Sequence, residues 1–173
     1  MISETDKLVA DLAQQRFQYD GLIYMMYSLD QSNQIVPLYI GKTETVGKTP
    51  QKLSVNLENL HHDKSKFARW GDSYAYHIGD LSAAVLLDHS PDKITPKYRD
   101  WASSLFVTTP TDEPTLKAPV FIWAKAWGHE DVGIGKQHGS THLLSLEDSM
   151  IGVASVVFPN ILLNRQGQNR AFE

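Results

Sequence analysis

The alternation of apolar and polar positions along the chain first predicts a set of β-strands. Residues 21–41 contain two apolar, aromatic-rich runs on either side of residues 28–34, a cluster of turn-forming side chains. This is the pattern of a β-hairpin with a loop longer than the minimal two residues. Residues 73–79 alternate aromatic and smaller residues and predict a third strand, and the apolar run at residues 120–127 predicts a buried strand.

Apolar residues at helical spacing predict helices in much of the remaining chain. An amphipathic helix is expected at residues 3–17, and a second helix follows Pro50 and extends to about residue 62. Later helices are predicted at residues 80–87, at 97–106 and from Ser145 to the helix-ending Pro159. Together these elements indicate an α+β fold, with a small and mostly antiparallel sheet flanked by helices.

The length of 173 residues predicts a single domain over residues 1–173, with the first helix inside residues 1–20. The sequence contains no cysteine, which excludes disulfides, zinc–thiolate sites and thiol nucleophiles. No apolar run approaches the roughly 20 residues of a membrane span, and the polar, acidic N-terminus is not that of a signal peptide. We therefore expect no membrane association and a cytoplasmic location.

The net charge of −4 argues against a protein that coats nucleic acid by charge alone. The charge is nevertheless uneven, because the stretch from Lys42 to Arg69 holds six cations and three anions. Either a nucleic-acid site or a solvated helix face would produce this local excess of lysine.

The predicted hairpin carries two tyrosines followed by a glycine, and this arrangement has a family resemblance. The segments Leu22-Ile23-Tyr24 and Tyr39-Ile40-Gly41-Lys42-Thr43 resemble the signature of the GIY-YIG nucleases. The second half matches the signature letter for letter, whereas Leu22 stands where the first half normally has glycine. Without the resemblance, both tyrosines would be interpreted as core side chains.

The C-terminal part adds a carboxylate and an asparagine in the order that the family shows. On the last predicted helix, Glu147 shares a face with apolar residues that include Ile151 and Ala154. A carboxylate there requires a partner, which could be a metal ion, an arginine or backbone N–H groups. Glu147 and the later Leu163-Asn164 resemble the family's glutamate and its asparagine in a Leu-Asn context.

The resemblance implies the fold of these nucleases and their chemistry, which is the hydrolysis of phosphodiester bonds. Residues 80–118 are not needed by such a domain, so we interpret them as an insertion that serves substrate recognition. By similarity to the family, Glu147 would hold one divalent cation, Mg²⁺ or Mn²⁺. Tyr24 or Tyr39 would assist the attacking water, and Tyr24 is slightly preferred as the general base. Since a free tyrosine has a pKa of about 10, a base role requires a nearby cation such as Lys42 or Arg69.

The remaining candidate residues are assigned by the same resemblance and by residue chemistry. Arg69 would stabilise phosphate charge, and His77, on the third predicted strand, would orient water or contact phosphate unless it is a structural histidine. The candidates for substrate binding and site geometry are Gly41, Lys42, Lys48 and Asn164.

Three classes of function follow from these observations. The leading expectation is a metal-dependent endonuclease acting on DNA, for which double-strand cleavage would favour a homodimer or sequential nicking. The second is a catalytically inactive nuclease fold that binds nucleic acid or protein, and the third is a structural protein that binds no nucleic acid.

Overall fold

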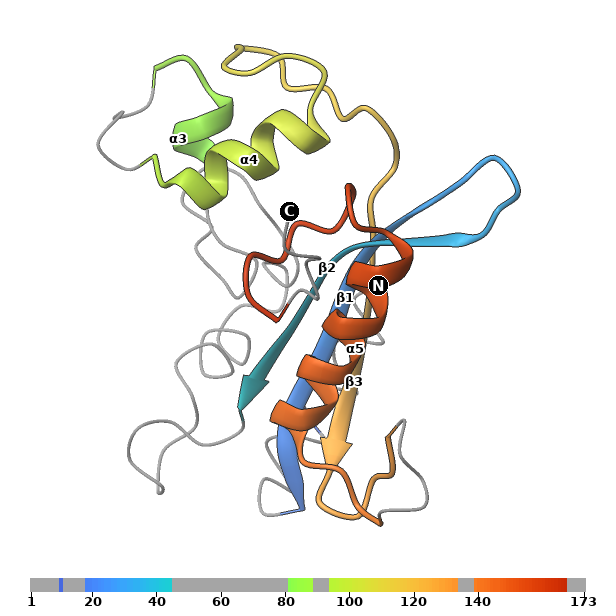
Figure 1. Cartoon of the computed structure of the whole chain (residues 1–173). Helices are drawn as coiled ribbons and strands as arrows, with labels where there is room; N and C mark the ends of the chain where they lie inside the picture. The colour runs from blue at the N-terminus through green and yellow to red at the C-terminus, as the bar shows by residue number, and fades with distance from the viewer. Residues whose placement is uncertain (1–9, 11–17, 45–80, 89–93, 134–138, 168–173) are drawn as a thin grey trace.

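The computed structural model describes residue 10 and residues 18–44, 81–88, 94–133 and 139–167 (Figure 1). Residue 10 is helical, but the rest of the helix predicted at 3–17 lies outside the described residues. The helix predicted at 50–62 and the strand predicted at 73–79 also lie outside them. The elements are β1 (Tyr19–Leu29), β2 (Ile35–Glu44), α3 (Ser82–Val85), α4 (Pro96–Leu105), β3 (Phe121–Gly128) and α5 (Leu143–Val157).

The three strands form one antiparallel sheet in the order β2-β1-β3, so β1 is the central strand. The predicted hairpin and the α+β class are therefore confirmed. The register places Tyr24 opposite Gly41, and an irregularity after Met26 leaves Leu38 without a partner on β1. In the described part of the chain, the third strand is β3.

The hairpin turn is held by the side chain of Asp30. Its Oδ1 atom accepts hydrogen bonds of 2.8 Å from the backbone N–H groups of both Ser32 and Gln34. Asn33 has a φ of 60°, a left-handed conformation that asparagine tolerates better than most residues. The polar residues between the two apolar runs thus form the turn that their composition predicted.

The strand predicted at 120–127 exists as β3, but the prediction that it is buried was wrong. Phe121 and Trp123 are each 41% exposed, and Trp127 is the buried aromatic residue of the strand. The reason is the position of β3 at the edge of the sheet, where side chains meet fewer neighbours. A short apolar run does not distinguish such a strand from one buried on both faces.

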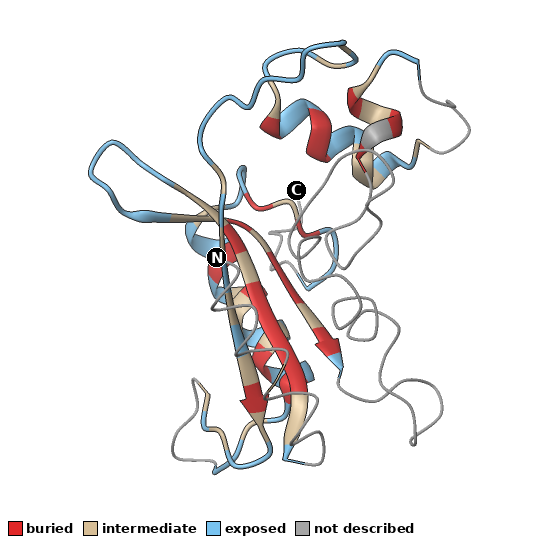
Figure 2. Ribbon diagram, turned by 180° about the vertical axis from the view of Figure 1, so that it is seen from behind, coloured by how far each residue is buried: buried red, intermediate tan, exposed pale blue. Residues whose placement is uncertain are grey.

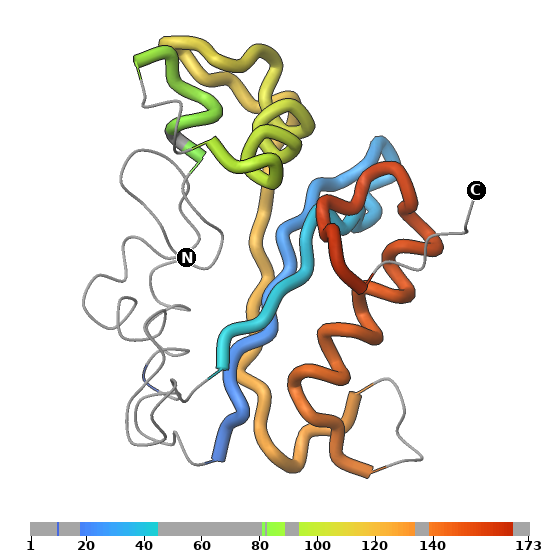
Figure 3. Tube along the Cα trace, turned by 60° about the vertical axis from the view of Figure 1, so that its left-hand side comes forward, coloured from blue at the N-terminus to red at the C-terminus, as the bar shows by residue number. Residues whose placement is uncertain are grey.

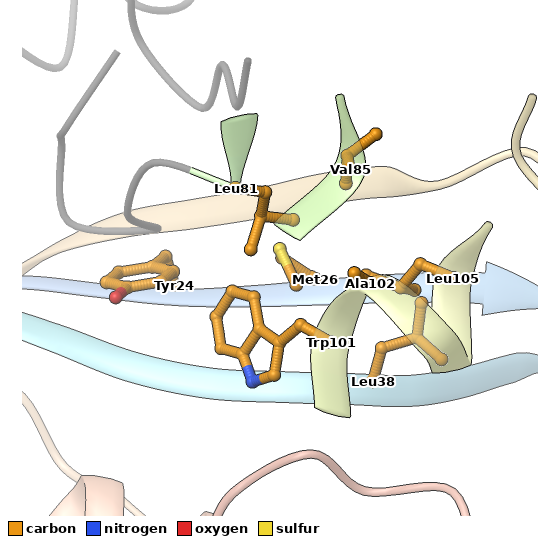
Figure 4. Close-up of a cluster of buried hydrophobic side chains, with 8 residues drawn as sticks. All are labelled: Tyr24, Met26, Leu38, Leu81, Val85, Trp101, Ala102 and Leu105. Carbon is orange, nitrogen blue, oxygen red and sulfur yellow. The ribbon is translucent and has the colours of Figure 1, made fainter. Parts of the chain in front are cut away.

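In the described residues, the core consists of two clusters on either side of the sheet, and the buried residues of β1 lie in the middle part of the strand (Figure 2). Ile23 and Ile40 pack against α5, which runs along one face of the strands (Figure 3). The other cluster joins strands β1 and β2 to α3 and α4, and Trp101 of α4 lies among its members (Figure 4). Its residues are Tyr24, Met26, Leu38, Leu81, Val85, Trp101, Ala102 and Leu105.

The two longer helices begin in different ways. Thr95 caps α4 by accepting a hydrogen bond from the Tyr98 N–H, and Pro96 occupies the first turn, so the predicted helix at 97–106 is confirmed within one residue. The last helix was expected to begin at Ser145 with a side-chain cap, but α5 begins at Leu143 without one. Leu143 is buried against the sheet, so its packing sets the start of the helix. No helix within the described ranges is long and apolar enough to cross a membrane.

Replacing Trp101 by alanine should lower the free energy of unfolding by about 3–5 kcal/mol, because its fully buried ring would leave a cavity. Urea denaturation measures this change. The matched control is Trp123→Ala on β3, where the side chain is partly exposed, and this change should cost less than half as much. Equal losses at the two positions would contradict the role of Trp101 as a core residue.

Candidate functional site

A pocket of about 410 Å³ lies where β2, α4, α5 and the C-terminal segment meet. Tyr39 comes from β2, Lys97 from α4 and Glu147 from α5, so three elements far apart in sequence contribute to one cavity. Its lining consists of Tyr39, Lys97, Leu144, Glu147, Asp148, Ile151, Leu163, Asn164, Arg165, Gln166 and Gly167.

Asn164 fixes the C-terminal segment to the edge of β2. Its side-chain oxygen accepts a hydrogen bond of 3.0 Å from the Ile40 N–H, and its side-chain nitrogen donates one of 2.8 Å to the Ile40 carbonyl. The Leu163 N–H donates to the Leu38 carbonyl at 2.7 Å. Because Asn164 is buried, these bonds position the pocket wall against β2 with little competition from water.

Gly41 allows Tyr24 to lie flat against β2. A Cβ atom at position 41 would lie 2.4 Å from the Tyr24 hydroxyl oxygen and 2.9 Å from a ring carbon of Tyr39. The two tyrosine rings are 6.2 Å apart between centroids. A glycine after the second tyrosine is therefore a requirement of packing, because any side chain would displace both rings.

The two tyrosines have different environments. Tyr24 is buried behind the pocket and Tyr39 is part of its lining. Burial raises the pKa of Tyr24 well above its ordinary value, and the neighbouring Tyr39 and Glu147 raise it further. Burial also raises the pKa of Tyr39, with Glu147 adding to it, whereas a hydrogen bond with Tyr24 lowers it. At neutral pH both hydroxyls are protonated and Tyr39 is the one placed to meet a ligand.

Glu147 is half-buried in the second turn of α5, beyond the first turn where a helix dipole stabilises carboxylates. Burial raises the pKa of its carboxyl group, and the charge and backbone N–H of Lys42 partly oppose this shift. Lys42 itself forms an ion pair of 2.7 Å with Glu44. Asp148 is exposed, as expected for a residue one position further round the helix.

The residues around Glu147 fit a weakly held divalent cation. Mg²⁺ binds commonly through one or two carboxylates, with water and substrate phosphate as its other ligands, and Asp148 lines the same pocket. A desolvated carboxylate gains from a cation, because the cation compensates for lost hydration. Within the described ranges, no group of three or more His, Cys, Asp or Glu side chains could hold a metal ion, so a purely protein-bound centre is not built there.

Two cations of the pocket were not among the predicted site residues. Lys97 lies with its Nζ atom 5.0 Å from the ring centroid of Tyr39 and 4.8 Å from that of Trp101. Arg165 forms an ion pair with Asp100 of α4. Arg165 could have been found from the sequence, because it follows the predicted site residue Asn164. Lys97 could not, because it lies in residues 80–118, which were interpreted as an insertion.

The pocket brings together three predicted residues, Tyr39, Glu147 and Asn164. Tyr24 and Gly41 lie next to Tyr39. The charge of Lys42 acts on Glu147 and lowers the pKa of its carboxyl group. Three further candidates, Lys48, Arg69 and His77, lie outside the described residues.

No family model, curated protein or solved structure matches this chain.

Gly41→Ala should destabilise the protein by about 1–3 kcal/mol, because the new methyl group overlaps the Tyr24 ring in a packed core. The same substitution at Gly152, in α5, is the matched control. Apart from the backbone of α5 itself, no atom of the described residues lies within 4 Å of a Cβ atom there, so Gly152→Ala should stabilise the helix by about 0.5–1 kcal/mol. Chemical denaturation of both variants measures the signs, and a loss of stability at both positions would refute this explanation of Gly41.

Glu147→Gln should be more stable than the wild type at pH 7–8 in the absence of divalent metal. Since the pKa of Glu147 is raised on folding, ionisation penalises the folded state above the folded pKa, and the penalty is absent below the unfolded pKa of about 4.3. The advantage of the variant should therefore disappear as the pH falls to about 4. Melting temperatures over this range measure it, with the exposed Glu130→Gln as the control. A variant that is less stable at pH 7 would contradict the prediction.

Proposed function

We propose that the protein is a metal-dependent endonuclease of the GIY-YIG type that hydrolyses phosphodiester bonds in DNA. The observation that supports this proposal is the convergence of Tyr39, Glu147 and Asn164 on one pocket. These residues come from distant parts of the chain, and the tyrosine, glutamate and asparagine follow the order of the nuclease pattern. Separate structural roles would not require them to share a cavity.

Each residue has a role in this proposal that its surroundings allow. A divalent cation at Glu147 would supply charge neutralisation at the phosphate and at the leaving 3′ oxygen. Tyr39 would hold the attacking water through its hydroxyl group, and Tyr24 would orient that hydroxyl from behind. Asn164 would act as a positioning residue, since both polar atoms of its side chain already bind the backbone of Ile40.

The raised pKa values of the tyrosines constrain the proton transfer. A protonated Tyr39 donates or relays a hydrogen bond at neutral pH, and it becomes a general base only when added positive charge in the pocket lowers its pKa. Tyr24 is less suited to contact water because it is 2% exposed. We therefore propose Tyr39 as the residue that contacts the nucleophile.

The same tyrosine environments favour one alternative, a nuclease-like fold that binds nucleic acid or protein without cleaving it. Both phenols are held in the protonated form, as a binding site would tolerate.

For the nuclease itself, a DNA substrate would agree with the expected cytoplasmic location. Cleavage of both strands would favour a homodimer or sequential nicking.

Supercoiled plasmid incubated with the protein and Mg²⁺ should be nicked, and EDTA should abolish the reaction. Glu147→Ala should reduce the cleavage rate by at least about 10²-fold, because it removes the carboxylate proposed to hold the cation. Tyr39→Phe should cause a comparable loss, whereas Tyr24→Phe should cause a smaller one.

The control for this experiment is Glu130→Ala, which removes an exposed carboxylate outside the pocket. Cleavage by Glu147→Ala at the wild-type rate would contradict the site assignment. Binding of DNA without any cleavage would favour the alternative of a binding module.

A further inference from the structure

The first turn of α4 carries a lysine into the pocket from a segment that the nuclease pattern does not include. Lys97 follows Pro96 at the start of the helix, and the first turn contains no acidic residue. A cation near a helix N-terminus interacts unfavourably with the helix dipole. The position of Lys97 is therefore not explained by the needs of the helix that carries it.

The described residues around Lys97 do not neutralise its charge. Its ammonium group lies over the rings of Tyr39 and Trp101, which supply a modest cation–π attraction. Burial lowers the pKa of Lys97, and no ion pair joins it to a carboxylate within the described ranges. Asp100 lies one turn further along α4, where it could pair with a lysine, but it is paired with Arg165.

The chemical consequence is a half-buried ammonium group that lines the cavity and has no carboxylate paired with it among the described residues. The carboxylate of Glu147 lines the same cavity. A phosphodiester is an anion that Lys97 and Glu147 could bind together. The ammonium group would bind a phosphate oxygen directly, and the carboxylate would bind a divalent cation that contacts the same phosphate. A bound phosphate would also stabilise the charged form of Lys97, which burial destabilises by removing water from the ammonium group.

We propose that Lys97 contacts a backbone phosphate of the nucleic acid bound in this pocket and holds it opposite Glu147 and beside Tyr39. The inference rests on the proposed function, and it makes α4 a part of the active site. The rings of Tyr39 and Trp101 lie beneath the ammonium group itself, so this group is held in place before substrate arrives.

The first test measures binding without cleavage. A fluorescein-labelled DNA duplex is titrated with protein in EDTA at several salt concentrations, and the slope of log K against log salt is compared between variants. Loss of one phosphate contact should reduce the magnitude of the slope by about 1 in Lys97→Met, whereas Lys97→Arg should keep the wild-type slope. Methionine retains an unbranched side chain over the two rings, and equal melting temperatures would verify that the fold is intact.

The matched control is Lys125→Met on β3. Lys125 also lies over an aromatic ring, with its Nζ atom 4.6 Å from the centroid of Trp127, but it is paired with Asp131 and does not line the pocket. Its replacement removes the same charge and should leave the salt slope closer to that of the wild type than Lys97→Met does.

Cleavage of plasmid with Mg²⁺ provides the second readout, in which Lys97→Met should be slower by about 10–10³-fold and Lys97→Arg should recover part of the rate. Cleavage with an unchanged rate and salt slope in Lys97→Met would overturn the role of Lys97 and leave the nuclease proposal standing. A reduced slope without cleavage by any variant would support the phosphate contact and overturn the nuclease. If the wild type binds no DNA, both proposals are wrong.

Discussion

The close approach of Tyr24 to the backbone of Gly41 is the constraint on which the site depends. The antiparallel register sets these residues opposite each other, and the absence of a Cβ atom lets the phenol lie against β2. Tyr39 then leans toward the pocket, where its ring contacts Trp101 at 4.7 Å between centroids. A glycine in a strand interior normally weakens the strand, and here that cost is offset by the packing it permits.

The pocket holds charges in surroundings that do not favour them. Glu147 and Lys97 are each partly desolvated, and burial moves the pKa of each group in the direction of its neutral form. Opposite charges that line one pocket without forming an ion pair with each other suit a ligand that carries both signs, such as a phosphate accompanied by a cation. The same residues in a purely structural role would gain more from pairing with each other.

Local patterns were sufficient to predict the hairpin, the start of α4 and the half-buried position of Glu147, because each depends on residues within a few positions of one another. The edge position of β3 was missed, since strand order depends on contacts between distant segments. Lys97 was missed for a related reason, because only the packing of α4 against β2 brings it to Tyr39. Asn164 was predicted as a site residue by resemblance, but its bonds to Ile40 required the fold.

The way in which Asn164 meets β2 has a consequence for how the sheet can grow. A single side-chain amide occupies both the N–H and the carbonyl of Ile40, and the neighbouring Leu163 N–H donates to the Leu38 carbonyl. At these two residues, the C-terminal segment therefore takes the place of a further strand along β2. The opposite margin belongs to β3, where Phe121 and Trp123 are exposed. Among the described strands, β3 is therefore the place where an additional strand, from this chain or another, would extend the sheet by backbone pairing.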